Sequence, residues 1–77
     1  MAIQSTLLDE IEVLQMFDLS STQQGIKIHH NARNAVKQAA EKLFKQGLIT
    51  QRDGGYLTDL GYEAAQHLQH ALEIIAD

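Results

Sequence analysis

Two adjacent glycines, Gly54 and Gly55, separate two long helical patterns in this chain of 77 residues. Residues 48–52 before them and 56–58 after them contain the β-branched and aromatic side chains that are typical of strands. Because glycine supplies the positive φ of tight hairpin turns, Asp53-Gly54-Gly55 predicts a turn between two antiparallel strands. The central pair of that turn can be either Asp53-Gly54 or Gly54-Gly55. The chain therefore has to pack its helices around one hairpin.

A helix is the clearest prediction, and it spans residues 31–46. Its apolar positions recur at spacings of three and four, and they are Ala32, Ala35, Val36, Ala39, Leu43 and Phe44. Gly47 follows at the position where a left-handed residue commonly ends a helix. The lysines of the last turn, Lys42 and Lys45, suit the negative end of the helix dipole.

Two further helices are predicted near the ends of the chain. The first spans about residues 7–17, with Thr6 as its N-cap and with Asp9 and Glu10 in a first turn where the dipole favours acids. The last helix begins after Thr58, which is its predicted cap. We expect its buried stripe to consist of Leu60, Ala64, Leu68, Ala71, Leu72 and Ile75.

Residues 20–30 allow two local structures. Ile26 and Ile28 alternate with polar neighbours and follow Gly25, which is typical of a short strand. Ser20-Ser21-Thr22 can instead cap a short helix that runs to about Ile28. The two β-branched isoleucines favour the strand.

The predicted order of elements is helix, strand, helix, hairpin, helix. The expected fold class is therefore mainly α with a β-hairpin (α+β), arranged like a winged helix-turn-helix, in a single domain 1–77. The expected core contains the large apolar residues Ile11, Leu14, Leu43, Phe44, Leu57, Leu68 and Leu72. The last helix carries more apolar surface than one contact with the core needs, in Ala65, Ile74 and Ile75. This excess predicts a homodimer formed through the C-terminal helix.

Two segments resemble parts of known regulators. Leu43-Phe44-Lys45-Gln46-Gly47-Leu48-Ile49-Thr50 resembles the end of a recognition helix and the start of the wing in many bacterial regulators. Tyr56-Leu57-Thr58-Asp59-Leu60-Gly61 resembles the exit from the wing in regulators of the MarR type.

The chain is also similar, over nearly its full length, to small bacterial proteins of unknown function, some of which are labelled as DNA-binding proteins. Residues 18–27 and 53–61 carry this resemblance, which implies a winged helix and a role in transcription regulation. A full winged helix has a separate helix before the recognition helix, and only residues 20–31 are available for it here.

The basic residues are concentrated in the middle of the chain, although the net charge is −4. All six lie between Lys27 and Arg52 with one acid, Glu41, among them, and the other acids precede or follow. Arginine, asparagine and glutamine can read base edges in a major groove, and lysine contacts phosphates. We expect helix 31–46 and the hairpin 48–58 to bind double-stranded DNA. The expected contacts are Lys27, Arg33, Asn34, Lys37, Gln38, Lys42 and Arg52.

These basic side chains should share one face, clear of the acids. The alternative function is a protein–protein interaction module on the same fold without DNA binding, because winged-helix folds host both functions.

Other function classes lack the residues they need. The chain has no cysteine, and the pairs His29-His30 and His67/His70 supply too few ligands for a typical zinc site, so no metal is expected. No nucleophile motif or glycine-rich phosphate loop is present, so we expect neither an enzyme nor a cofactor. The first residues contain no signal-peptide pattern, and no apolar run is long enough to span a membrane, which favours a cytoplasmic location.

Overall fold

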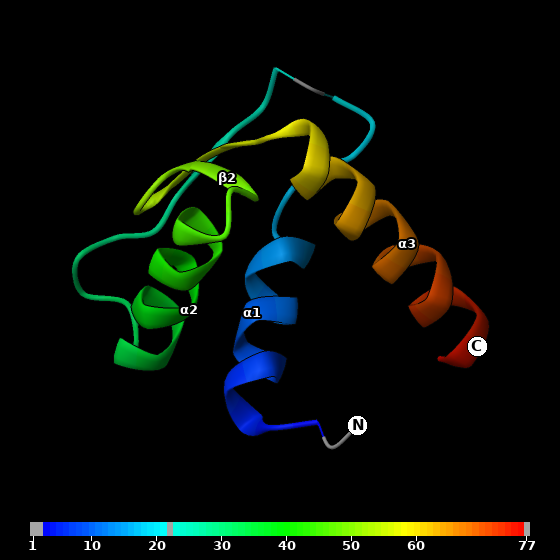
Figure 1. The fold of residues 1–77 in the computed structure, drawn as a ribbon, viewed down its shortest axis with the longest axis horizontal. Helices are drawn as coiled ribbons and strands as arrows, with labels where there is room; N and C mark the ends of the chain where they lie inside the picture. The colour runs from blue at the N-terminus through cyan, green and yellow to red at the C-terminus, as the bar shows by residue number, and fades with distance from the viewer. Residues whose placement is uncertain (1–2, 22, 77) are drawn as a thin grey trace.

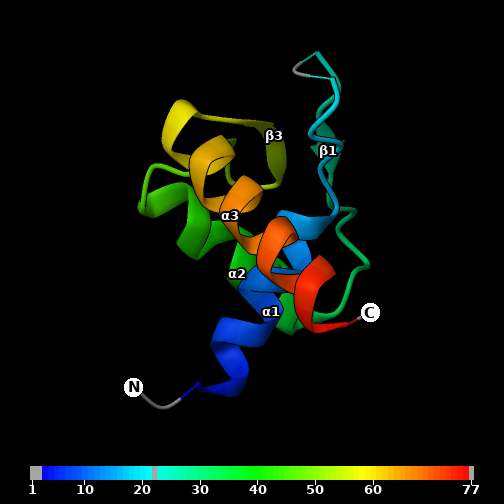
Figure 2. The same ribbon diagram turned by 90° about the vertical axis from the view of Figure 1, so that its right-hand side faces the viewer.

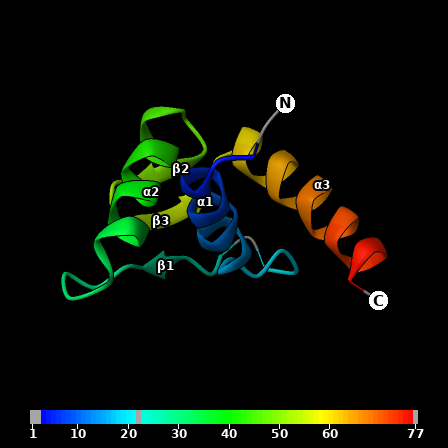
Figure 3. The ribbon, with the colours of Figure 1, turned by 90° about the horizontal axis from the view of Figure 1, so that it is seen from below.

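Three helices and a small antiparallel sheet make up the computed structural model, which describes residues 3–21 and 23–76. In chain order the elements are α1 (Ser5–Gln15), β1 (Ile26–Lys27), α2 (Asn34–Lys45), β2 (Ile49–Gln51), β3 (Gly54–Leu57) and α3 (Asp59–Ile75). α1 lies between α2 and α3, and the hairpin β2–β3 lies across the end of α2 (Figure 1; Figure 3, from below). The expected α+β class is confirmed.

The sheet has the strand order β1-β3-β2, with both pairs antiparallel. β1 lies beside β3 (Figure 2), with Ile26 opposite Gly55 and Lys27 opposite Gly54. Ile28 continues this contact, because its N–H donates to the carbonyl oxygen of Asp53 at 2.7 Å. Of the two structures that the sequence allowed here, the strand is therefore correct. A hairpin whose return strand also pairs with an earlier strand gives the layout of a winged helix.

The hairpin turn differs from both predicted alternatives. Gln51 pairs with Gly54, so Arg52 and Asp53 form the turn, and both glycines belong to β3. Gly54 and Gly55 have φ values of +125° and +70°, and an irregularity in the register lies between Ile49 and Gln51. A β-carbon on Gly54 would lie 2.6 Å from the Ile26 carbonyl oxygen. The glycines are needed because β3 is flanked closely on both sides.

The helix ends follow the sequence signals in part. The Thr58 hydroxyl accepts a hydrogen bond from the Gly61 N–H at 3.0 Å, which confirms the predicted cap of α3. Gly47 follows α2 with a φ of +79°, as predicted. The Thr6 cap is wrong, because α1 begins at Ser5 without any side-chain cap, and its first turn holds no acid.

The segment before α2 contains turns. α2 begins at Asn34, three residues later than predicted, and a turn at residues 30–31 precedes it, in which the Ala32 N–H donates to the His29 carbonyl oxygen at 3.0 Å. The separate helix of a full helix-turn-helix is therefore missing between β1 and α2. Support for α2 comes from α1 and β2, which both contact it.

The core lies where α1, α2 and the sheet meet. Leu14 and Leu43 are buried as expected, whereas Phe44, Leu57 and Leu68 are half-buried against the core, and Ile11 and Leu72 are also half-buried. The remaining buried apolar residues are Val13, Phe17, Ile28, Val36, Ala39, Ala40, Ile49 and Ala65. Small alanines on α2 allow α1 to pack closely against it.

The predicted buried stripe of α3 is wrong for half of its residues. Leu60, Ala71 and Ile75 are exposed, whereas Ala64, Leu68 and Leu72 are half-buried. Gly61 is buried, and so is Ala65, which was expected to add to the surplus apolar surface. The cause lies in Gly61, since a β-carbon there would collide with the carbonyl oxygen of Leu48. This close approach turns the line through positions 61, 65, 68 and 72 toward the core.

Candidate nucleic-acid interface

Three of the expected DNA contacts line one cleft. Lys27, Lys37 and Arg52 lie around a cavity of about 410 Å³ formed by the end of β1, α2 and the hairpin turn. The cavity lining is Lys27, Ile28, His29, His30, Lys37, Glu41, Arg52 and Asp53. We call it the basic cleft. Because these three cationic side chains come from three segments, they can contact an anionic group of a ligand from several sides.

Two hydrogen bonds to backbone carbonyl oxygens hold the walls of the basic cleft in place. The hydrogen bond from Ile28 to Asp53 ties the segment after β1 to the hairpin turn. Lys37 Nζ donates to the His30 carbonyl oxygen at 2.8 Å, which ties the next turn to α2. The lysine ammonium has three donors, so this bond leaves donors free for another acceptor.

Arg52 is held above α2 by two weak contacts. Its guanidinium lies 5.7 Å from the centre of the Phe44 ring, and its Nη1 is 3.5 Å from Glu41 Oε1. The side chain of Arg52 is 70% exposed, so neither contact removes its charge from solvent. Glu41 also pairs with Lys45 at 3.6 Å, and one carboxylate therefore faces two basic side chains.

Arg33 and Lys42 contact acids of α1. Arg33 Nη2 lies 3.3 Å from Glu12 Oε2, and both side chains are exposed. Lys42 Nζ lies 2.9 Å from Glu10 Oε1, and the Glu10 side chain is only 7% exposed. The expectation that the basic residues would lie clear of the acids is wrong for these two. Their ion pairs join α1 to α2.

The remaining expected contacts lie on the exposed side of α2. Asn34 and Gln38 are both exposed. Gln38 lines a shallow depression of about 280 Å³ together with Glu41, Lys42 and Lys45. Since Glu41 also lines the basic cleft, the depression and the cleft adjoin. The polar face of α2 and the cleft thus form one continuous surface.

His29 and His30, which the sequence brought to attention only as a pair too small for a zinc site, were not among the expected DNA contacts. Both line the basic cleft, and both are exposed. An imidazole ring offers N–H donors that suit phosphate oxygens. Their place next to Lys27, directly after a short strand that pairs with the hairpin, was the signal that could have identified them.

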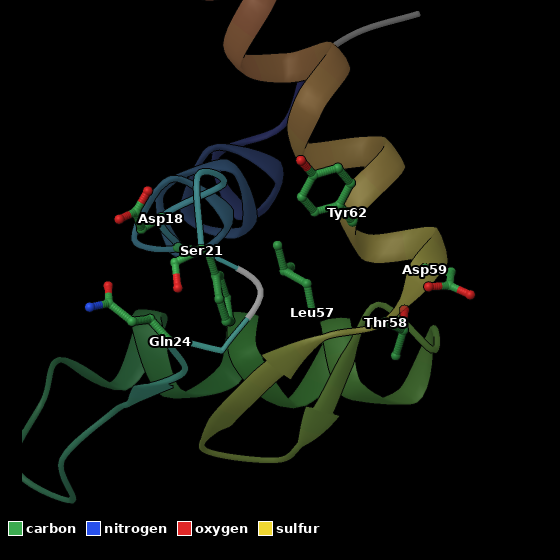
Figure 4. Close-up of a pocket in the computed structure, with 8 residues that line it drawn as sticks. Asp18, Ser21, Gln24, Leu57, Thr58, Asp59 and Tyr62 are labelled. Carbon is green, nitrogen blue, oxygen red and sulfur yellow. The ribbon is translucent and has the colours of Figure 1, made fainter.

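A second cavity lies on another side of the molecule. It measures about 250 Å³ and lies between the segment after α1 and the start of α3 (Figure 4). Tyr62 and Leu57 point into it, and the Tyr62 hydroxyl donates to the Leu19 carbonyl oxygen at 3.1 Å. At its rim, the Ser20 hydroxyl and, with a smaller effect, the Ser20 N–H donate hydrogen bonds to the Asp18 carboxylate, and these bonds lower the pKa of Asp18. These bonds hold the turn that follows α1.

In residues 3–21 and 23–76, no three histidine or acidic side chains gather in a way that could hold a metal ion. None of the helices in this part of the chain has the length and apolar character needed to cross a membrane.

Comparison with known proteins places the chain in a family and gives it no named relative. No curated protein and no solved structure matches it. The model of one protein family, described as a family of unknown function (DUF5669), matches residues 1–76. The match covers nearly the whole chain, and the protein therefore belongs to this family of unknown function.

Proposed function

We propose that this protein binds double-stranded DNA, with backbone phosphates in the basic cleft and the polar face of α2 in the major groove. The observation that carries the proposal is that Lys27, Lys37 and Arg52 line one cleft beside an exposed polar helix. The winged-helix layout supports it, because this fold commonly presents a helix and a hairpin to DNA.

Each exposed group has a role that its chemistry suits. Lys27 and Lys37 neutralise phosphates, and Arg52 at the hairpin turn reaches a phosphate or a narrow minor groove. Asn34 and Gln38 carry amides that pair with adenine edges in a major groove. Arg33 and Lys42 are already paired with acids of α1, so we assign them to helix packing rather than to DNA contact.

The charge balance sets the expected strength of binding. Glu41 and Asp53 also line the cleft, and the whole chain carries a net charge of −4. Long-range repulsion therefore lowers the rate of encounter with DNA, and the affinity is modest. Three neutralised phosphates predict a slope of about −3 for the logarithm of the binding constant against the logarithm of the salt concentration.

Fluorescence anisotropy of a labelled duplex, titrated at low and increasing salt, tests the proposal. Lys37→Gln should weaken binding to all sequences alike and reduce the salt slope by about one unit. Arg33→Gln is the matched control, because it changes the net charge equally but removes a side chain outside the cleft. Equal losses for both variants would contradict the role of the cleft, and no binding at low salt would overturn DNA binding itself.

A protein-interaction role is the second candidate, and the exposed apolar side of α3 favours it. Leu60, Ile74 and Ile75 are among the most exposed large apolar residues of the described chain. Contiguous apolar surface of this kind commonly marks a site of protein contact.

A further inference from the structure

The apolar surface of α3 is wider than the rest of the fold covers. Its inner line, at positions 61, 65, 68 and 72, faces α1 and the sheet. A second line runs along its outer side, where Leu60 is 55% exposed, Ile74 69% and Ile75 77%. Ala64, His67 and Ala71 lie between these large residues at helical spacing. We call this line the outer stripe.

The position of α3 leaves the outer stripe accessible. The helix lies at the edge of the molecule, on the opposite side of α1 from α2 (Figures 1 and 3). Its 17 residues give it a length of about 25 Å at the rise of an α-helix. Its start is fastened closely, because Gly61 contacts Leu48 and the Thr58 hydroxyl donates to the Gly47 carbonyl oxygen at 2.6 Å.

We infer that the outer stripe pairs with the outer stripe of a second copy of this chain, with the two α3 helices antiparallel. The order of side-chain sizes supports this arrangement. A two-fold axis at His67 places Leu60 of one copy opposite Ile74 of the other. The same axis places Ala64 near Ala71. Large residues therefore meet at both ends, Ala64 and Ala71 lie on either side of the centre, and the two His67 side chains meet at the axis itself.

The polar side chains beside the outer stripe support the same orientation, because a carboxylate can accept a hydrogen bond from an imidazole N–H. Glu63 and His70 are exposed and lie two turns apart on one side of the stripe. In an antiparallel pair, Glu63 of each copy lies beside His70 of the other. A parallel two-fold pair would instead place Glu63 of one copy on the opposite side of the stripe from His70 of the other, so that this contact would be lost.

The inference is independent of DNA binding, since the outer stripe and the basic cleft share no residue. One helical face is smaller than a standard protein interface, so the dimer should have a dissociation constant in the micromolar range. It should be visible by sedimentation equilibrium as a rise in average mass above the 8.6 kDa of one chain.

Sedimentation of a Leu60→Gln, Ile74→Gln double variant tests the surface. This variant should raise the dissociation constant at least about tenfold, because the apolar ends of the stripe are lost. Thermal unfolding of the dilute protein should be unchanged, since both residues are exposed in the single chain. Ile3→Gln is the matched control, because Ile3 is 65% exposed outside α3. A wild-type protein that stays monomeric up to millimolar concentration would overturn the proposal.

Disulfide cross-linking tests the orientation, and the chain suits it because it has no native cysteine. His67→Cys should cross-link to itself under mild oxidation, faster than Gln38→Cys on α2. Leu60→Cys should not cross-link to itself, because its two copies would lie about 21 Å apart along the helices, well beyond disulfide range. A mixture of Leu60→Cys and Ile74→Cys should give the mixed disulfide. Rapid self-linking of Leu60→Cys would indicate a parallel pair and contradict the proposal.

Discussion

α2 and α3 are both amphipathic helices, but the structure uses their apolar sides differently. The apolar side of α2 is enclosed by α1 and β2, and its polar side forms ion pairs or remains in solvent. α3 has apolar residues around a wider arc, and the single chain covers only one line of them. Helical periodicity therefore identifies the buried face when the apolar stripe is narrow. When the stripe is wide, a single tertiary contact decides which line is buried.

Truncation of the inward-facing leucines should show the difference most strongly. Leu43 of α2 is 1% exposed, so Leu43→Ala should lower the free energy of unfolding by about 3–5 kcal/mol. Leu72 of α3 is half-buried, so Leu72→Ala should lower it by about 1–2 kcal/mol. Urea unfolding followed by circular dichroism measures both values. Equal losses would contradict the view that α2 forms the centre of the core and α3 its edge.

Gly61 should be the residue that orients α3. A β-carbon there collides with the Leu48 carbonyl oxygen, so Gly61→Ala should cost about 3 kcal/mol through displacement of the helix. Gly47 provides the comparison, because a β-carbon there meets nothing within 4 Å and only its positive φ opposes alanine. Gly47→Ala should cost about 1 kcal/mol. If thermal unfolding shows Gly61→Ala to be the milder of the two, close packing does not set the orientation of α3.

The two ion pairs between α1 and α2 should differ in strength. Glu10 is buried and depends on Lys42, whereas Glu12 and Arg33 are both exposed. A double-mutant cycle of Glu10→Gln and Lys42→Met should give a coupling of about 1–2 kcal/mol, reduced by the exposure of the lysine. The cycle of Glu12→Gln and Arg33→Met should give less than about 0.5 kcal/mol. A larger coupling for the exposed pair would contradict the assignment of Lys42 to helix packing.

The smallest effect is expected at the outer stripe of α3. Ile75 is 77% exposed, so Ile75→Ser should change the unfolding free energy of the dilute protein by less than about 0.5 kcal/mol. The same substitution should weaken self-association measured at high concentration. A large loss of stability at low concentration would mean that this side of α3 packs within the single chain.

Local signals in the sequence were sufficient for much of the fold. The presence of the hairpin and of the three helices, the Thr58 cap and the left-handed Gly47 could all be predicted, whereas the turn residues of the hairpin and the first residues of α1 and α2 could not. These features depend on contacts between residues within one or two turns of each other. The strand at Ile26 was favoured for the same reason, because β-branched residues after a glycine suit extended backbone. The candidate site was predicted in part, since Lys27, Lys37 and Arg52 do line one cleft.

The features that the sequence did not predict depend on contacts between residues that are far apart in the chain. The approach of Gly61 to Leu48 determines which side of α3 is buried, and the pairing of β1 with β3 places both glycines inside a strand. The acids of α1 reach Arg33 and Lys42 only because α1 packs against α2. The sequence alone therefore determined the type and order of the elements, because local propensity acts over a few residues. The partners of each side chain were determined by packing, because burial and charge pairing act between elements that are far apart in the chain.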